Sequence, residues 1–271
     1  MLAADQAESL RRMLAPRTTR RIAVLGCEPG AGATTVALGL ASALALQGER
    51  VLLVDEDIAG ARATRLANAA PRGTLAQVLA GTMSAQEAAG QRGAGAPEVL
   101  PGDPRAAGSA AGLQGYRTVL CDARPGADGS LSPFAGDAHN AIVVLQPERA
   151  SLTAAYACIK RLHHQYAWRE FQLVVNGAAG EAGVEAVVGN LARTAGQYLG
   201  VQVRLAGAMP ADPLVARSMS LGRCVVEAFP GAPATAVLRR IAAGIAAWPI
   251  PAAIDARAAS APGASAMACQ F

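Results

Sequence analysis

The sequence predicts an α/β fold in which a mostly parallel sheet is flanked by helices on both faces, a three-layer α/β/α arrangement. Three observations predict it. Short apolar runs alternate with longer helical stretches along the 271 residues, as in parallel strands joined by right-handed crossovers. The runs are continuously apolar, which is typical of strands buried on both faces. Hydrophobic residues make up 52% of the chain but aromatic residues only 4%, so the core must be aliphatic.

The apolar runs and helical stretches give the expected order of elements. We expect strands at 21–26, 50–54, 98–100, 117–122, 141–145, 171–176 and 203–207. We expect helices at 33–47, 73–80, 150–166, 181–199 and 234–247. The Gly-, Ala- and Pro-rich stretch 90–116 is predicted to be loops around its one short strand. These elements form one domain over residues 20–248.

Residues 1–19 are predicted to form a separate amphipathic helix and linker. Asp5 can cap the helix, Leu10 and Met13 lie on its apolar face, and Pro16 ends it. The basic residues of this region suit either a solvated helix and linker or a docking segment for an acidic partner. They are Arg11, Arg12, Arg17, Arg20 and Arg21.

Composition excludes several classes of protein. The net charge of +4 gives no strong nucleic-acid signal. Five cysteines in no zinc spacing indicate a reduced, cytosolic protein. No apolar run reaches the roughly 18 residues that span a bilayer. The tail, 249–271, is rich in Pro, Ala, Ser and Gly and is predicted to be disordered.

The turn after the first strand has the glycines of a phosphate-binding loop. Residues 26–35 read G-C-E-P-G-A-G-A-T-T. Gly30 and Gly32 allow backbone N–H groups to close around phosphate oxygens at a helix N-terminus. Thr34 stands where a threonine would hold Mg²⁺. The loop has no lysine, and Lys160 is the chain's single lysine.

Carboxylates follow two of the neighbouring strands. Asp55 and Asp57 come after one predicted strand, and Asp122 ends another. Open α/β sheets bind ligands at the carboxyl ends of their strands, so these side chains and the loop are expected to share one site. The alternative is that acidic residues merely end strands, a reasonable interpretation for any one of them but a weaker one for all together.

Four motifs give the chain a family resemblance. Asp5-Gln6-Ala7 is followed by Leu10-Arg11, and residues 146–160 carry Pro-Glu, Ser and Ala-Tyr after a strand. A strand ends at Asn176, and Pro210-Ala211-Asp212 comes later. With the loop, these motifs resemble the MinD/ParA branch of deviant-Walker-A P-loop ATPases over residues 5–247. The N-terminal motif narrows the resemblance to MinD-like regulators of flagellar number and placement (FlhG/FleN type).

The resemblance implies a P-loop NTPase fold of the SIMIBI/MinD-like kind, with ATP and Mg²⁺ as cofactors. At the phosphates it implies Gly30, Gly32, Ala33, Thr34 and Thr35, and at adenine Asn176 and Asp212. At Mg²⁺ it implies Thr34, Asp55 and Asp122. It implies that Asp57 is the catalytic, water-positioning residue. It also implies that the N-terminal helix activates a flagellar signal-recognition-type GTPase (FlhF). The residues for that role are Asp5, Gln6, Leu10, Arg11 and Arg12.

The loop departs from the family pattern at both cationic positions. Glu28 stands where the family has a lysine that reaches across a dimer, and Ala33 stands where it has a second lysine. Pro29 removes a backbone N–H. A charge pair about 4 Å apart is worth about 4 kcal/mol at an effective dielectric constant near 20. We therefore expect impaired ATP binding, dimerisation and hydrolysis, with Asp57 vestigial.

Two functions are consistent with these observations. One is a catalytically degenerate, MinD-like scaffold of flagellar assembly whose N-terminal helix stimulates the GTPase, with flagellar basal-body or transcriptional regulators as further partners. The other is an active ATPase switch that cycles between a monomer and a membrane-bound dimer. The second needs a helix that lies on lipid, and an apolar stripe in the last helix could supply one or could pack on the sheet. The stripe is Val237, Leu238, Ile241, Ile245 and Trp248. A DNA-partitioning function fits less well, because the N-terminal motif is foreign to it.

Overall fold

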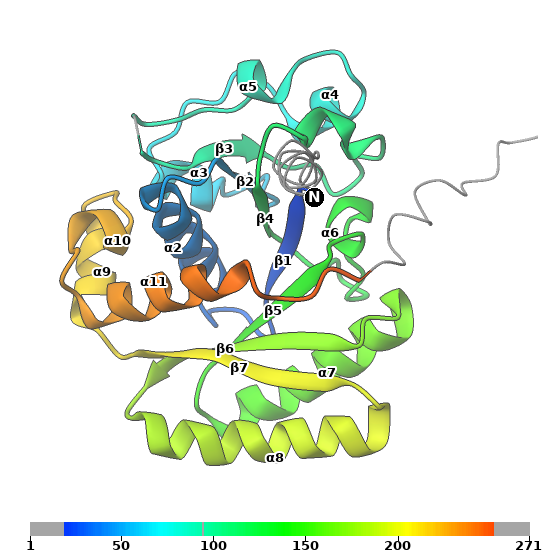
Figure 1. Ribbon diagram of the computed structural model, residues 1–271, viewed down its shortest axis with the longest axis vertical. Coiled ribbons are helices and arrows are strands. Elements are labelled where there is room, and N and C mark those ends of the chain that lie inside the picture. The colour runs from blue at the N-terminus through cyan, green and yellow to red at the C-terminus, as the bar shows by residue number, and fades with distance from the viewer. Residues whose placement is uncertain (1–18, 94, 252–271) are drawn as a thin grey trace, which may run out of the picture.

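The computed structural model describes residues 19–93 and 95–251, which form one seven-stranded parallel sheet (Figure 1). The strand order is β3-β2-β4-β1-β5-β6-β7. The strands are β1 (Arg20–Gly26), β2 (Val51–Asp55), β3 (Glu98–Pro101), β4 (Thr118–Asp122), β5 (Asn140–Leu145), β6 (Glu170–Ala178) and β7 (Gln202–Pro210). Every pairing between these strands is parallel, so the predicted fold class is confirmed.

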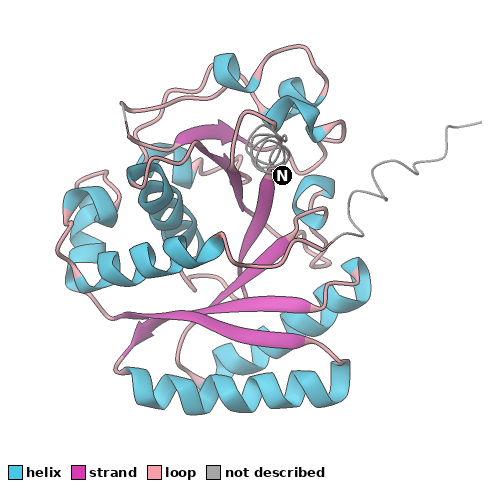
Figure 2. Cartoon of the chain, viewed as in Figure 1, coloured by secondary structure: helices cyan, strands magenta, loops and turns pink. Residues whose placement is uncertain are grey.

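Helices cover both faces of the sheet (Figure 2). They are α2 (Ala33–Leu46), α3 (Arg62–Leu66), α4 (Leu75–Leu79), α5 (Ala85–Ala88), α6 (Pro133–Gly136), α7 (Arg149–Tyr166), α8 (Glu181–Leu199), α9 (Pro213–Ser220), α10 (Val225–Ala228) and α11 (Pro233–Ile245), with a 3₁₀ turn at Ala110–Leu113. α2, α10 and α11 pack on one face, and α7 and α8 pack on the other.

The seven strands and five helices expected from the sequence all occur, with ends shifted by up to three residues, and the helix expected at 73–80 is reduced to α4. The helices α3, α5, α6, α9 and α10 were not expected. All of these except α9, which has eight residues, have only four or five residues, which is too short for a hydrophobic period to appear. Local caps define several of them. Ser84 and Glu87, for example, form a capping box at the start of α5.

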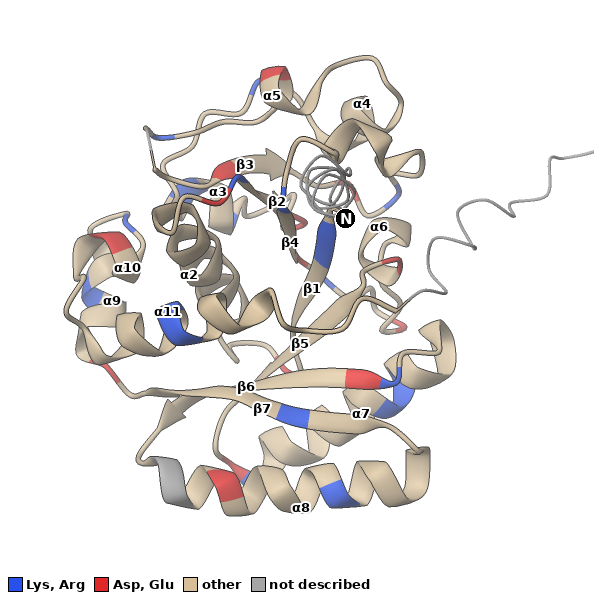
Figure 3. Cartoon of the chain, in the orientation of Figure 1, with Lys and Arg blue, Asp and Glu red and all other residues tan. Residues whose placement is uncertain are grey.

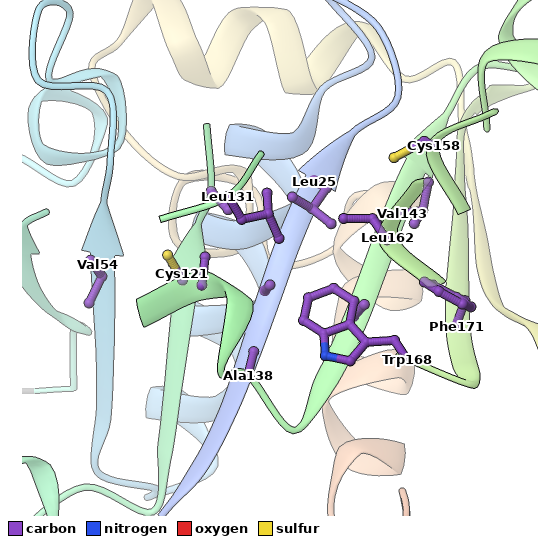
Figure 4. Packing of buried hydrophobic residues seen from close by; sticks show 14 of the residues in the cluster. Leu25, Val54, Cys121, Leu131, Ala138, Val143, Cys158, Leu162, Trp168 and Phe171 are labelled. Atoms are coloured by element: carbon purple, nitrogen blue, oxygen red, sulfur yellow. The ribbon is translucent and has the colours of Figure 1, made fainter. Parts of the chain in front are cut away.

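Alternate residues of β1 separate the two layers of the core. Ile22 and Val24 face α2 and α11, whereas Ala23 and Leu25 face the layer of α7 and α8. Figure 4 shows Leu25 among the side chains of that second cluster. Because both faces of the strand are buried, its sequence is continuously apolar.

The pairing register brings the strand-end carboxylates together. Asp55, the last residue of β2, lies directly beside Asp122, the last residue of β4. Val24 of β1 also pairs with Asp122, so the loop that follows β1 begins next to these carboxylates. The sheet therefore gathers the chemistry of three strands at one edge.

The apolar stripe of the last helix is buried. Val237, Leu238, Ile241 and Ile245 all belong to the core cluster between α11, α2 and the sheet. Trp248 packs against the same cluster. The stripe therefore packs on the sheet instead of facing lipid. In the part of the chain that the structure describes, no helix is both long and apolar enough to cross a membrane.

At the two ends of the chain, the predicted N-terminal helix and nearly all of the predicted tail lie outside the described residues. Close to the tail, the Asn140 side-chain amide donates a hydrogen bond of 2.8 Å to the Pro249 carbonyl. Asn140 also accepts a 2.7 Å hydrogen bond from the Arg20 guanidinium. Asn140 therefore joins the first and last described parts of the domain.

Leu238→Ala should lower the free energy of unfolding by roughly 2–5 kcal/mol, because it leaves a cavity between α11 and α2. Leu238 is fully buried and fills the space beside the missing side chain of Gly39. Urea unfolding followed by circular dichroism measures the change. Leu221→Ala, at a leucine that is 56% exposed, is the control and should change stability little. Equal effects of the two substitutions would contradict this packing.

Candidate functional site

The candidate site is a cleft of about 640 Å³ at the carboxyl edge of the sheet. Residues 26–35, the loop between β1 and α2, form one wall. The segment after β4, residues 122–127, forms another. Its volume falls within the range of about 300–1,000 Å³ that is usual for small-molecule sites.

The loop has the backbone of a phosphate cradle. Gly30 and Gly32 have φ angles of +86° and +96°, which favour glycine. Asn176, at the end of β6, donates a 3.0 Å hydrogen bond to the Ala31 carbonyl. A Cβ on Gly32 would lie 2.3 Å from the Asn176 side-chain nitrogen, so glycine is required there. The side chain predicted to read adenine therefore also holds the loop.

Thr34 and Asp122 face each other across the cleft. Thr34 hydrogen-bonds to the Asp122 carboxylate, and both residues line the cleft. The pKa of Asp122 is raised to about 7, first by burial and then by repulsion from Asp55, Asp57 and Glu56, against the lowering effect of Thr34. The pair has the arrangement expected of a Mg²⁺ threonine and its strand-end carboxylate.

Asp55 is committed to hydrogen bonds within the protein. One carboxylate oxygen accepts bonds from the Thr64 amide and hydroxyl, both at 2.8 Å. The other accepts a 3.1 Å bond from the Asp57 amide. A Mg²⁺ ion held by Asp55 would have to compete with these bonds. The observed role of Asp55 is to fix the segment from β2 to α3.

Asp57 is held by an arginine that the sequence did not single out. The Arg124 guanidinium lies 2.5 Å from the Asp57 carboxylate, and the Gly60 amide donates to the same oxygen at 3.1 Å. Both charged residues line the cleft. The predicted water-positioning carboxylate is thus engaged in an ion pair.

Glu56 is a second feature that sequence analysis missed. Its side chain is only 1% exposed, yet it accepts hydrogen bonds from the Ser132 hydroxyl at 2.5 Å and the Arg124 amide at 3.1 Å. It therefore ties the segment after β2 to the segment after β4. In a run of three acidic residues, the sequence does not show which side chain turns inward.

The cleft contains equal numbers of basic and acidic residues. Three arginines line it, from α3, the segment after β4, and α7, and three carboxylates oppose them. The basic residues are Arg62, Arg124 and Arg161, and the acidic residues are Glu28, Asp57 and Asp122. None of these arginines belongs to the loop. The lining side chains therefore carry no net charge when Asp122 is ionised and a net charge of +1 when it is protonated.

The remaining predicted residues are placed as follows. Ala33 and Thr35 line the cleft beside Thr34. Asp212 caps α9 by accepting a 2.9 Å bond from the Leu214 amide, and it also accepts from the Ala234 amide at the start of α11. Asp5, Gln6, Leu10, Arg11 and Arg12 lie outside the described residues.

The residues present fit Mg-ATP only in part. The positive-φ glycines give the loop the backbone of a cradle, and Thr34 and Asp122 place in the cleft a hydroxyl and a carboxyl group that would hold Mg²⁺ if a nucleotide brought it. Within residues 19–93 and 95–251, no group of three His, Cys, Asp or Glu side chains could hold a metal ion. Mg²⁺ would therefore need phosphate oxygens and water to complete its shell. The loop side chains supply none of the positive charge on which phosphoryl transfer depends.

The sheet order and the loop geometry are those of a P-loop fold, and comparisons with known proteins show the same fold in MinD-type proteins. The model of an AAA domain matches residues 19–123. The cell-division ATPase MinD of Pyrococcus furiosus superposes with a TM-score of 0.66 at 21% identity, covering 85% of this chain and 99% of that one. MinD of Pyrococcus horikoshii, solved with Mg-ADP, gives 0.65 at 21% identity, over 84% and 96%.

The chain has the fold of MinD/ParA-type proteins, and its sequence resembles that of FleN. The antiactivator FleN of Pseudomonas aeruginosa is 29% identical to it, over 85% of this chain and 88% of FleN. Because the alignment covers most of each protein, the likeness is not confined to the loop.

The stability of the protein should fall as pH rises from about 4 to about 7. Asp122 keeps its proton in the folded protein up to about pH 7, whereas its ordinary pKa is 3.8. Between those values only the folded state binds this proton, so stability falls by up to roughly 1.4 kcal/mol per pH unit. Urea unfolding of wild type and Asp122→Asn across this range measures the contribution.

Asp122→Asn should flatten the pH profile, because the amide does not titrate. The exposed Asp137→Asn is the matched control and should leave the slope unchanged. A profile that rises with pH and is the same in wild type and Asp122→Asn would contradict the raised pKa of Asp122.

Proposed function

We propose that this protein is a regulator of flagellar assembly that acts as a MinD-like scaffold with little or no ATP hydrolysis. The observation that carries the proposal is the loop. Its backbone conformation is that of a phosphate cradle, but Glu28 and Ala33 occupy both positions where the resemblance expects lysine. The likeness to the antiactivator FleN supports a regulatory function.

The charges around the cleft favour a scaffold over an ATPase. Arg124 is paired with Asp57, and opposing carboxylates match the three cleft arginines in number. Asp55 and Glu56 are satisfied by the protein's own donors, so the architecture does not need a nucleotide to neutralise them. Such a site can persist as structure after it loses catalysis.

In this proposal the N-terminal segment carries the activity. Gln6 would act in the active site of a signal-recognition-type flagellar GTPase, with Arg11 and Arg12 in docking. This mechanism does not use the chain's own cleft. It is consistent with a sequence that keeps Asp5-Gln6-Ala7 while its loop has no cation.

A second candidate is an active ATP-dependent switch. The Thr34–Asp122 pair favours it, because these groups are suited to hold Mg²⁺ on a nucleotide. The buried stripe of α11 weighs against the membrane-bound part of such a cycle. We therefore rank the scaffold first.

Ala33→Lys should increase the affinity for Mg-ATP at least ~10-fold, because it returns a positive charge to the phosphate cradle. Isothermal titration calorimetry and phosphate release measure binding and turnover. Wild type should show no turnover above background. Ala236→Lys puts the same charge on an exposed position of α11 and should leave binding unchanged. Tight binding and turnover by wild type would instead favour the switch.

Gln6→Ala in the full chain should reduce stimulation of the partner's GTP turnover at least ~10-fold, the scale expected when a group that positions reactants is lost. Deletion of residues 1–18 should abolish stimulation while keeping β1, which starts at Arg20. Gln114→Ala, at an exposed position, is the matched control. If wild type and Gln6→Ala stimulate equally, or neither stimulates, the proposed N-terminal activity is wrong.

A further inference from the structure

A second pocket of about 400 Å³ lies where α2 ends, beside α10 and α11, and shares no lining residue with the cleft. Residues of the α5–β3 loop form its opposite side. Figure 3 shows basic segments on that loop, on the connection between α9 and α10, and on α11, around an acidic segment of α10. We call this the arginine pocket. Its charged residues are Arg92, Arg223, Glu227 and Arg239.

One of the three arginines is neutralised inside the pocket. Arg92 makes an ion pair of 3.1 Å with Glu227, the acidic residue that lines the pocket. The other Glu227 oxygen accepts a 3.5 Å hydrogen bond from Ser42. Arg223 and Arg239 make no side-chain ion pair or hydrogen bond within the described parts of the chain. The lining therefore has a net charge of +2 from these two side chains.

Arg223 has an unsatisfied donor. Its Nε–H is buried and has no acceptor among the residues that the structure describes. Buried N–H groups nearly always find a partner, so each exception needs a physical explanation. A carboxylate accepts well from a guanidinium, whose parallel N–H groups match its two oxygens. An anionic group in this pocket would lie beside a guanidinium that has no acceptor among the described residues.

The pocket also offers apolar surface. Leu46, at the end of α2, is 51% exposed, although most of that helix is buried. Val226, buried in the core, lines the pocket as well. Exposed leucine next to arginine is the combination that protein interfaces use, with an apolar contact and a charge-assisted hydrogen bond. A free phosphate or a nucleic-acid backbone would leave Leu46 without a matching group.

We propose that the arginine pocket is a docking site for an acidic segment of a partner protein, one that carries carboxylates next to an aliphatic side chain. Arg223 and Arg239 bind the carboxylates, and Leu46 contacts the aliphatic group. Arg92 keeps its ion pair with Glu227, and this pair holds the α5–β3 loop at the pocket. The site is separate from the cleft and does not depend on whether a nucleotide binds there.

Fluorescence anisotropy with the labelled peptide Glu-Leu-Glu-Glu-Leu-Glu tests the proposal on the full chain. Wild type should bind it saturably, and Arg223→Met and Arg239→Met should each weaken binding roughly tenfold, the loss expected for one charge-assisted hydrogen bond. Arg193→Met is the matched control, because Arg193 lies exposed on α8 and should not affect binding. No saturable binding to wild type, or equal binding by all variants, would overturn the proposal.

Stability separates a binding role for Arg223 from a structural one. Arg223→Met removes a buried donor that has no acceptor, so its urea midpoint should equal or exceed that of wild type while peptide binding weakens. A lower midpoint would show that Arg223 supports the fold and would overturn its assignment as a binding residue. Arg239, exposed on α11, then tests the pocket without involving the core.

Two further probes identify the class of partner. A single-stranded oligonucleotide and vesicles containing phosphatidylglycerol are titrated against wild type and Arg239→Met. If the occupant is an acidic protein segment, neither probe should bind through this pocket. If either probe binds wild type and loses roughly tenfold in Arg239→Met while the peptide does not bind, the occupant is that other anion and the proposal is wrong.

Discussion

The structure depends on how it accommodates buried carboxylates at the carboxyl edge of a parallel sheet. Asp55, Glu56 and Asp122 are all buried where β2 and β4 end side by side. Unpaired buried charges are costly, and these carboxyl groups avoid that cost in two ways. Asp55 and Glu56 accept hydrogen bonds from nearby amides and hydroxyls, whereas burial raises the pKa of Asp122 to about 7.

These solutions connect the walls of the cleft. The bonds to Asp55 hold α3 against β2, and those to Glu56 hold the segment after β4 against the segment after β2. Arg124 then contributes twice, through its amide to Glu56 and through its guanidinium to Asp57. The cleft is therefore held by the protein's own donors. The loop itself is held separately, by the Asn176 amide on the Ala31 carbonyl, and this bond also needs no lysine.

The cleft and the arginine pocket differ in their charge balance. In the cleft, three arginines face three carboxyl groups, and Arg124 is already paired with Asp57. In the arginine pocket, one carboxylate faces three arginines, and a buried Nε–H has no acceptor. Charge complementarity therefore directs an anionic partner toward the pocket at the end of α2 more than toward the loop. The scaffold function that we propose would need a surface of this kind to bind a partner.

The sequence by itself determined the layers, the strands and the position of the loop, because continuous apolar runs and positive-φ glycines are local properties of the chain. It also located Thr34, Asp122 and Asn176, which the structure places around one cleft. It could not show that Glu56 turns inward, that Arg124 pairs with Asp57, or that Arg92, Arg223 and Arg239 share a pocket. Those facts join segments far apart in the chain. Only tertiary packing decided them, because the burial of a charge and the choice of its partner depend on which strands end side by side.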